Sequence, residues 1–231
     1  MQLTIALDLP DQKANLALAE KLAGFDIWLK VGFRSYIRDG KAFLNELKRI
    51  NPEFRIFLDL KLYDIPNTMA DAAEEIAALG VDMFNIHASA GPEAMQAVMQ
   101  RLEGMNTRPL VLAVTALTSF DDATFRRIYG ASIDEKAAEF AKMSYTHGLD
   151  GVVCSVFESA AIKAQTNENF LTLCPGIRPF GEDAGDQKRV ADIAAALREK
   201  VDFPVVGRPV YKADDPAAKT AAILEAMNAQ G

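Results

Sequence analysis

The feature that most constrains the fold is an eightfold alternation along the chain. Short apolar or β-branched runs, each typical of a buried strand, recur eight times, and a stretch with helical periodicity follows each one. The predicted strands are residues 3–8, 27–31, 54–61, 81–87, 110–115, 151–155, 170–174 and 204–207. The predicted helices are residues 13–23, 34–50, 69–79, 93–102, 134–147, 158–165, 186–200 and 216–227. Such alternation predicts parallel strands joined by crossover helices.

The length of the chain favours one closed barrel over an open, doubly wound sheet. With 231 residues the chain is close to the roughly 250 usual for a (β/α)8 barrel, and no Ser/Gly-rich linker divides it. The sequence therefore predicts a single α/β domain over residues 1–231, a (β/α)8 or TIM barrel. The connections at residues 118–132 and 175–185 are long and polar, which predicts active-site loops at the carboxyl ends of the strands.

The bulk composition argues against several classes of function. The formal net charge of −7 disfavours a basic face for nucleic acid or for an anionic membrane. Neither a membrane span nor the basic region of a signal peptide is visible, so we expect a cytoplasmic location. Cys154 and Cys174 lie in apolar runs, where a small buried hydrophobe is the expected role. His87 and His147 lack the spacing of a metal pair, and no metal site is predicted.

The third predicted strand carries charges where an apolar run is expected. Residues two apart point to the same side of a strand, so Asp59 and Lys61 share one face and apolar residues line the other. Asp64 follows just past the strand end. Buried charges are costly even when they are paired, so this cluster indicates a site for chemistry on a small molecule. For the Asp-x-Lys pair taken alone, a structural ion pair remains an alternative.

Two neighbouring strands send matching groups to the same end of the barrel. By the two-residue period, Asp8 ends the first strand and Lys30 lies near the end of the second. With Asp59 and Lys61 they make four charges of alternating sign, which can neutralise one another while facing a ligand. His87 ends the fourth strand on the inward face, where a structural hydrogen-bonding role and a catalytic role both stay open.

The end of the eighth strand predicts a phosphate site. Gly207 lets backbone N–H groups approach an oxyanion, and Arg208 supplies a forked donor, where barrels commonly bind phosphate. The loop before it brings Arg178 or Gln187 within reach of the same ligand. An ordinary surface loop with solvated charges is the alternative for that segment.

Three motifs together carry a resemblance to a known family. They are Asp59-x-Lys61-x-x-Asp64-Ile65-Pro-Asn-Thr68, Pro175-Gly-Ile-Arg178 and Val206-Gly207-Arg208-Pro209. They resemble the short, stand-alone bacterial form of orotidine 5′-phosphate decarboxylase, and the likeness runs from Asp8 to Arg208 in the expected order. Tyr63 is a small departure, because many bacterial relatives have His at that position.

The resemblance implies a reaction and its catalytic residues. Orotidine 5′-monophosphate (OMP) would lose CO2 to give uridine 5′-monophosphate (UMP) in de novo pyrimidine biosynthesis, with no metal or organic cofactor. Lys61 would stabilise the carbanion that develops at C6 and deliver its proton there. Asp59 and Asp64 would crowd the substrate carboxylate, and Lys30 would orient the charge array. Whether the two acids destabilise the bound substrate or mainly hold Lys61 in place stays open.

The resemblance also implies the binding residues and the assembly. Asp8 and Lys30 would hold ribose hydroxyls, and Thr118 would meet the amide edge of the pyrimidine. The 5′-phosphate would be bound by Gln187, Gly207 and Arg208. Arg178 belongs to the ligand-binding set of the family. The implied assembly is a homodimer, in which the active site of one subunit receives Asp64, Ile65 and Thr68 of the other.

Two rival interpretations remain. A Mg²⁺-dependent sugar-phosphate enzyme of the same barrel group, such as 3-keto-gulonate 6-phosphate decarboxylase or hexulose-phosphate synthase, shares the Asp-x-Lys-x-x-Asp pattern. Such an enzyme would have an acidic metal ligand on strand two, where this chain has Lys30. A non-catalytic barrel that binds nucleotides would have no physical need for the full set of Asp59, Lys61 and Asp64.

Overall fold

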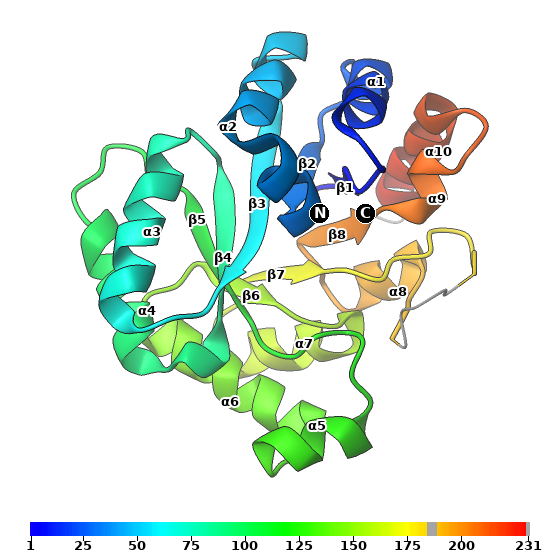
Figure 1. The fold of residues 1–231 in the computed structure, drawn as a ribbon. Helices are drawn as coiled ribbons and strands as arrows, with labels where there is room; N and C mark the ends of the chain where they lie inside the picture. The colour runs from blue at the N-terminus through cyan, green and yellow to red at the C-terminus, as the bar shows by residue number, and fades with distance from the viewer. Residues whose placement is uncertain (184–188, 230–231) are drawn as a thin grey trace.

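Eight parallel strands form a closed barrel in the computed structural model, which describes residues 1–183 and 189–229 (Figure 1). The strands follow one another around the ring in chain order, and β8 closes it by pairing with β1. The strands are β1 (Thr4–Ala6), β2 (Trp28–Gly32), β3 (Arg55–Leu62), β4 (Met83–His87), β5 (Leu110–Val114), β6 (Gly151–Val153), β7 (Leu171–Cys174) and β8 (Phe203–Val206). The predicted TIM barrel is confirmed.

The helices surround the ring of strands, as Figure 1 shows. They are α1 (Gln12–Leu22), α2 (Phe33–Ile50), α3 (Pro66–Ala78), α4 (Pro92–Leu102), α5 (Asp122–Tyr129), α6 (Ile133–Thr146), α7 (Val156–Gln165), α8 (Ile193–Arg198), α9 (Arg208–Tyr211) and α10 (Pro216–Asn228), with a 3₁₀ turn, η1 (Ala88–Ala90), after β4. Within the two described ranges, none of them has the length and apolar character of a membrane span.

Two predictions of local structure were wrong. The segment 118–132, predicted as a loop, contains α5, whose first turn is capped by the Asp121 carboxylate accepting the N–H of Thr124 at 2.8 Å. Phe125 is the one buried residue of this helix, which has eight residues and is shorter than the window of about 11–18 residues over which helical periodicity is read from a sequence. The helix predicted over 186–200 begins only at Ile193, where Asp192 accepts the N–H of Ala195 at 2.7 Å. Residues 186–188 lie outside the described part of the chain.

The core has two layers, because strand residues alternate between the barrel interior and the helices. Trp28 and Phe57 lie inside the barrel and fill its core, and the Trp28 ring meets Phe203 edge-on at 5.3 Å. The second layer lies between the strands and the helices, and it includes Cys154 and Cys174, which are buried as predicted. The filled interior leaves space for a ligand only at the ends of the barrel.

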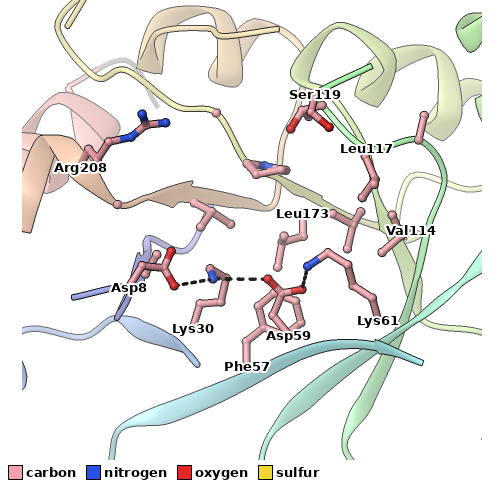
Figure 2. A pocket seen from close by; sticks show the side chains of 18 of the residues that line it. Asp8, Lys30, Phe57, Asp59, Lys61, Val114, Leu117, Ser119, Leu173 and Arg208 are labelled. Carbon is pink, nitrogen blue, oxygen red and sulfur yellow. Dashed lines mark hydrogen bonds and ion pairs between the residues drawn. The ribbon is translucent and has the colours of Figure 1, made fainter. Parts of the chain in front are cut away.

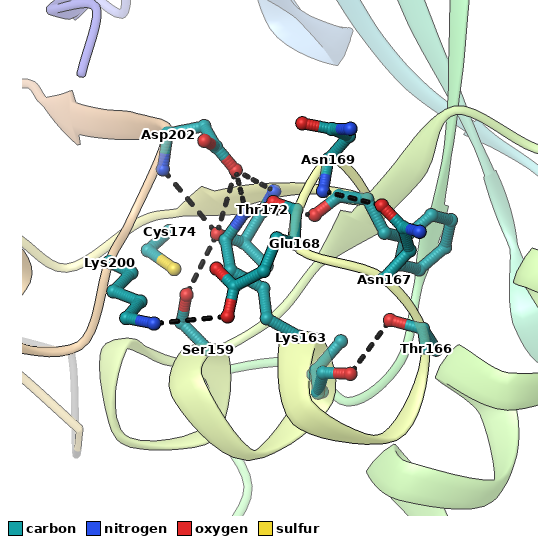
Figure 3. Close-up of polar contacts among 12 residues, drawn as sticks. Ser159, Lys163, Thr166, Asn167, Glu168, Asn169, Thr172, Cys174, Lys200 and Asp202 are labelled. Carbon is teal, nitrogen blue, oxygen red and sulfur yellow. Dashed lines mark hydrogen bonds and ion pairs between the residues drawn. The ribbon is translucent and has the colours of Figure 1, made fainter.

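A charged network lies between α7 and the amino-terminal ends of β7 and β8 (Figure 3). The buried Lys163 ammonium donates to the backbone oxygens of Glu168 and Phe170 at 2.9 and 3.0 Å, and its Nζ lies 2.8 Å from the Asp202 carboxylate. The same carboxylate accepts the N–H of Thr172 at 2.8 Å. This network joins the helix to both strands, and we refer to it below as the Lys163 network.

Candidate active site

A cavity of about 290 Å³ opens at the carboxyl-terminal ends of the strands. Its floor is formed by inner-layer residues such as Phe57, Val114 and Leu173. Eight of the residues predicted for the site line its walls, namely Asp8, Lys30, Asp59, Lys61, Thr118, Arg178, Gly207 and Arg208. Residues that the sequence analysis did not single out also line it, among them Leu117, Ser119 and Tyr211. Parallel strands thus bring side chains from distant parts of the chain to one end of the barrel.

Four charges form a continuous row along one wall of this cavity (Figure 2). Lys30 Nζ lies 3.3 Å from Asp8 Oδ1 and 3.3 Å from Asp59 Oδ2, and Lys61 Nζ lies 2.5 Å from Asp59 Oδ1. The predicted convergence of these charges from three successive strands is therefore confirmed. We call the four residues the charge row.

The row keeps its charges despite burial. Burial alone would raise the pKa of the Asp59 carboxyl, but the Lys30 and Lys61 ammonium groups outweigh it and lower that pKa to about 2. Burial would likewise lower the pKa of Lys30, yet the carboxylates of Asp59 and Asp8 raise it. Each middle member of the row is thus held in its ionised form by the neighbours on either side.

The backbone at the end of β3 departs from regular strand geometry. Lys61 has φ of +51°, in the left-handed region, which costs a non-glycine residue about 1–2 kcal/mol. The pairing with β4 shifts at the same point: Leu58 pairs with Phe84 and Leu62 with Ile86. Three residues of β3 therefore lie opposite the single residue Asn85, where a regular ladder would place one. Lys61 lines the cavity together with Asp59, within the stretch where the pairing shifts.

Asn85 is the polar residue of β4 that the sequence analysis missed. Its side chain is completely buried, donates from Nδ2 to Asp59 Oδ1 at 2.8 Å, and accepts the backbone N–H of Lys61 at Oδ1 at 2.7 Å. A signal existed in the sequence, because Asn85 is polar and shares the inward face of its strand with Met83. An amide there needs partners when it is buried.

The far side of the cavity is formed by the segments after β7 and β8. Gly207 and Arg208 line the cavity where β8 ends, and Arg208 is the first residue of the short helix α9. The loop after β7 is held at its base, because Arg178 donates its backbone N–H to Ala191 O at 2.8 Å and its Nε to Asp183 O at 2.6 Å. Gln187, predicted to bind phosphate, lies outside the described residues.

Three predicted residues do not reach the cavity of their own chain. Asp64, Ile65 and Thr68 lie on the exposed turn after β3 and the first turn of α3. The Asp64 carboxylate accepts the N–H of Ile65 at 2.7 Å. The acid, base and acid of the sequence motif are therefore divided within one chain: Asp59 and Lys61 line the cavity, and Asp64 faces outward.

His87 lies beside the cavity and is not among its lining residues. Its ring meets that of Tyr63 edge-on at 5.7 Å. Burial lowers the pKa of His87, and the nearby Lys61 ammonium lowers it further, so the ring is held neutral. A neutral imidazole packed against an aromatic ring fits a structural role better than proton transfer to a ligand in the cavity.

Comparison with known proteins agrees with the geometry. The family described as orotidine 5′-phosphate decarboxylase / HUMPS matches residues 1–223. The chain is 68% identical over 228 residues to orotidine 5′-phosphate decarboxylase of a Sulfurovum species, covering 99% of each chain. It is 67% identical over 224 residues to the protein of that name from a Nitratiruptor species, covering 97% of this chain and 99% of the other. The crystal structure of orotidine 5′-phosphate decarboxylase from Lactobacillus acidophilus is similar with a TM-score of 0.84 and 31% identity, covering 98% and 99% of the two chains.

Proposed function

The chain belongs to the orotidine 5′-phosphate decarboxylase / HUMPS family, and from this premise we propose that it converts OMP to UMP and CO2 in pyrimidine biosynthesis. It is a carbon–carbon lyase of the carboxy-lyase class, as its relatives are named. The observation that carries the mechanism is the Lys61 ammonium, which lines the cavity with Asp59 2.5 Å away.

Lys61 has the chemistry that the reaction requires. When the bond from C6 to the carboxylate carbon breaks, its electron pair stays on C6, and no adjacent carbonyl group accepts that charge. A cation beside C6 stabilises the developing carbanion, and the Lys61 ammonium then transfers a proton to C6. Asp59 holds Lys61 in place, and Lys30 holds Asp59 from the other side at 3.3 Å.

The opposite side of the cavity suits the phosphate end of the substrate. Figure 2 shows Arg208 across the cavity from Lys61, so an extended nucleotide spans the space between them. We propose that Arg208 and Gly207 bind the 5′-phosphate together with Gln187, and that Asp8 and Lys30 hold the ribose hydroxyls between the two ends. Thr118 then contacts the amide edge of the pyrimidine, and Arg178, which also lines the cavity, belongs to the ligand-binding residues. Binding energy from the remote phosphate would be used to orient C6 against Lys61.

We propose that the reaction proceeds without a metal or an organic cofactor. The residues of the charge row support this, because Lys30 already neutralises both acids that a divalent cation would need, at 3.3 Å from each. In the part of the chain that the structure describes, no three His, Cys, Asp or Glu side chains gather as metal ligands. The family description also covers sugar-phosphate enzymes, but none of the described residues that line this cavity favours Mg²⁺ chemistry over the cationic mechanism.

We further propose a cytoplasmic homodimer in which Asp64, Ile65 and Thr68 enter the partner's site. Support comes from apolar side chains that are exposed on α2 and on the turn after β3. Phe33 and Ile37 of α2 are 48% and 77% exposed, and Tyr63 and Ile65 are 64% and 67% exposed. The Phe33 ring lies 5.9 Å from Lys61 Nζ, which places Phe33 beside the cavity. Large apolar side chains that are exposed together in this way are typical of a protein interface.

The direct test follows the ultraviolet change as purified protein converts OMP to UMP in excess EDTA. The wild type should turn over fully, and Lys61→Ala should lose about 10⁴-fold in kcat because it lacks the cation and proton donor. Lys200→Ala is the matched control, because Lys200 is an exposed lysine that pairs with Glu168 at the other end of the barrel. Loss of wild-type turnover in EDTA, with activity on sugar phosphates restored by Mg²⁺, would contradict the proposal.

A further inference from the structure

The irregular pairing of β3 and β4 leaves one backbone donor to be satisfied by a side chain. Between the pairs Leu58–Phe84 and Leu62–Ile86, the β3 strand is two residues longer than the segment of β4 that it faces. The backbone N–H of Lys61, within this stretch, donates to Asn85 Oδ1 at 2.7 Å. Asn85 thus replaces a rung of the ladder at the residue whose φ is +51°.

The same amide also fixes the carboxylate that holds the Lys61 ammonium. Asn85 Nδ2 donates to Asp59 Oδ1 at 2.8 Å, and this oxygen is the one that lies 2.5 Å from Lys61 Nζ. The orientation of the amide is defined, since its oxygen must face an N–H donor and its nitrogen must face a carboxylate. One buried side chain therefore contacts the backbone of Lys61 and, through Asp59, determines where its ammonium lies.

We propose that Asn85 is a positioning residue for the decarboxylation, which couples the Asp59 carboxylate to the left-handed backbone of Lys61. This inference rests on the proposed function, in which Lys61 acts at C6. Asn85 itself does not line the cavity, so it acts through these two residues. Replacing it should misplace Lys61 by a fraction of an ångström to an ångström, a change that affects the rate of the chemical step more than substrate binding.

Two substitutions separate positioning from packing. Asn85→Ala removes both hydrogen bonds, and we expect kcat to fall by about 100-fold while KM changes much less. Asn85→Asp keeps the shape and the acceptor for the Lys61 N–H but replaces the donor with a second carboxylate beside Asp59. Its kcat should recover as the pH is lowered, because a protonated carboxyl group can donate to Asp59 again. The charged groups that face this position are Asp59 and Lys61, with Lys30 beyond Asp59 and His87 farther along β4.

The control is Thr172→Val, which removes the hydrogen bonds of a buried side chain in the Lys163 network at the opposite end of the barrel. It should lower the melting temperature but leave kcat and its pH profile unchanged. Wild-type kcat in Asn85→Ala, or an Asn85→Asp pH profile that parallels the wild type, would overturn the inference and reduce Asn85 to a packing residue. Wild-type protein is assayed with OMP in the same series, and only a failure of that reaction would count against the proposed function itself.

Discussion

Lys61 and Lys163 are two lysines removed from bulk water at opposite ends of the same barrel. The side chain of Lys163 is 3% exposed, and its ammonium has two backbone oxygens and one carboxylate within 3.0 Å. The side chain of Lys61 is 25% exposed, contacts the carboxylate of Asp59, and otherwise lines the cavity. An ammonium group has three N–H donors, so the protein satisfies those of Lys163, whereas Lys61 faces space that a ligand can occupy.

The difference separates a charge that holds the fold from one that is available for chemistry. The acceptors of Lys163 come from the segment before β7 and from the start of β8, so its network ties these strands to α7. Asp59, in contrast, takes its donors from β2, β3 and β4, and this arrangement leaves Lys61 oriented toward the cavity. Burial of a lysine alone therefore does not identify a catalytic group. The number of hydrogen-bond partners that each ammonium has within the protein is what distinguishes the two lysines.

The largest effect that tests this comparison should come from Lys163→Met. Removing the ammonium leaves the Asp202 carboxylate and two carbonyl oxygens without their buried partner, so the free energy of unfolding should fall by about 3–5 kcal/mol. The kcat of the folded fraction should stay at the wild-type value. Urea unfolding and OMP turnover measured on the same sample check both statements. A loss of kcat at unchanged stability would show that the two ends of the barrel are coupled.

A smaller effect should appear as pH dependence at the other end of the barrel. The pKa of Asp59 is lowered to about 2 in the folded protein, against about 3.9 in an unfolded chain. A lowered pKa contributes stability that is present above the unfolded value and is lost as the pH falls through the folded value, here about 2 kcal/mol between pH ~5 and ~2. Urea midpoints for wild type and Asp59→Asn should therefore converge over this range. A difference that stays constant with pH would contradict the lowered pKa.

The smallest effect should come from Lys200→Ala, a lysine with an ion pair but without burial. Lys200 Nζ lies 3.0 Å from Glu168 Oε1, and both side chains are exposed. Water screens such a pair and ordering two long side chains opposes it, so the change in unfolding free energy should be about 0.5 kcal/mol or less. Thermal melting in low and high salt measures it. A loss of unfolding free energy close to that of Lys163→Met would show that the N–O distance of an ion pair matters more than its burial. The comparison between the lysines would then fail.

The barrel could be predicted because strand and helix periodicities alternate eight times along the chain. The charge row could be located because the carboxyl ends of parallel strands lie at the same end of a barrel. Asn85 was missed for a different reason: its role arises from the shifted pairing between β3 and β4, which no local pattern reveals. Lys163 was also not foreseen, since a lysine near the end of a helix is usually solvated and its acceptors come from other segments. The motif spacing alone also did not show that Asp64 leaves the cavity of its own chain, because the exposed turn between β3 and α3 carries it away from Asp59 and Lys61.

The barrel is closed by the pairing of β1 with β8, the first and last strands to be synthesised, so closure comes late in translation. The charge row is complete once residues 8 to 61 have left the ribosome, whereas the cavity also needs Gly207 and Arg208 near the other end of the chain. During translation, the nascent chain thus has the charge row before the opposite side of the cavity has been made. The edge of β1 that pairs with β8 is also left unpaired. We expect chaperone binding and degradation to act on this intermediate, whose lifetime is set by the time needed to translate residues 62–208.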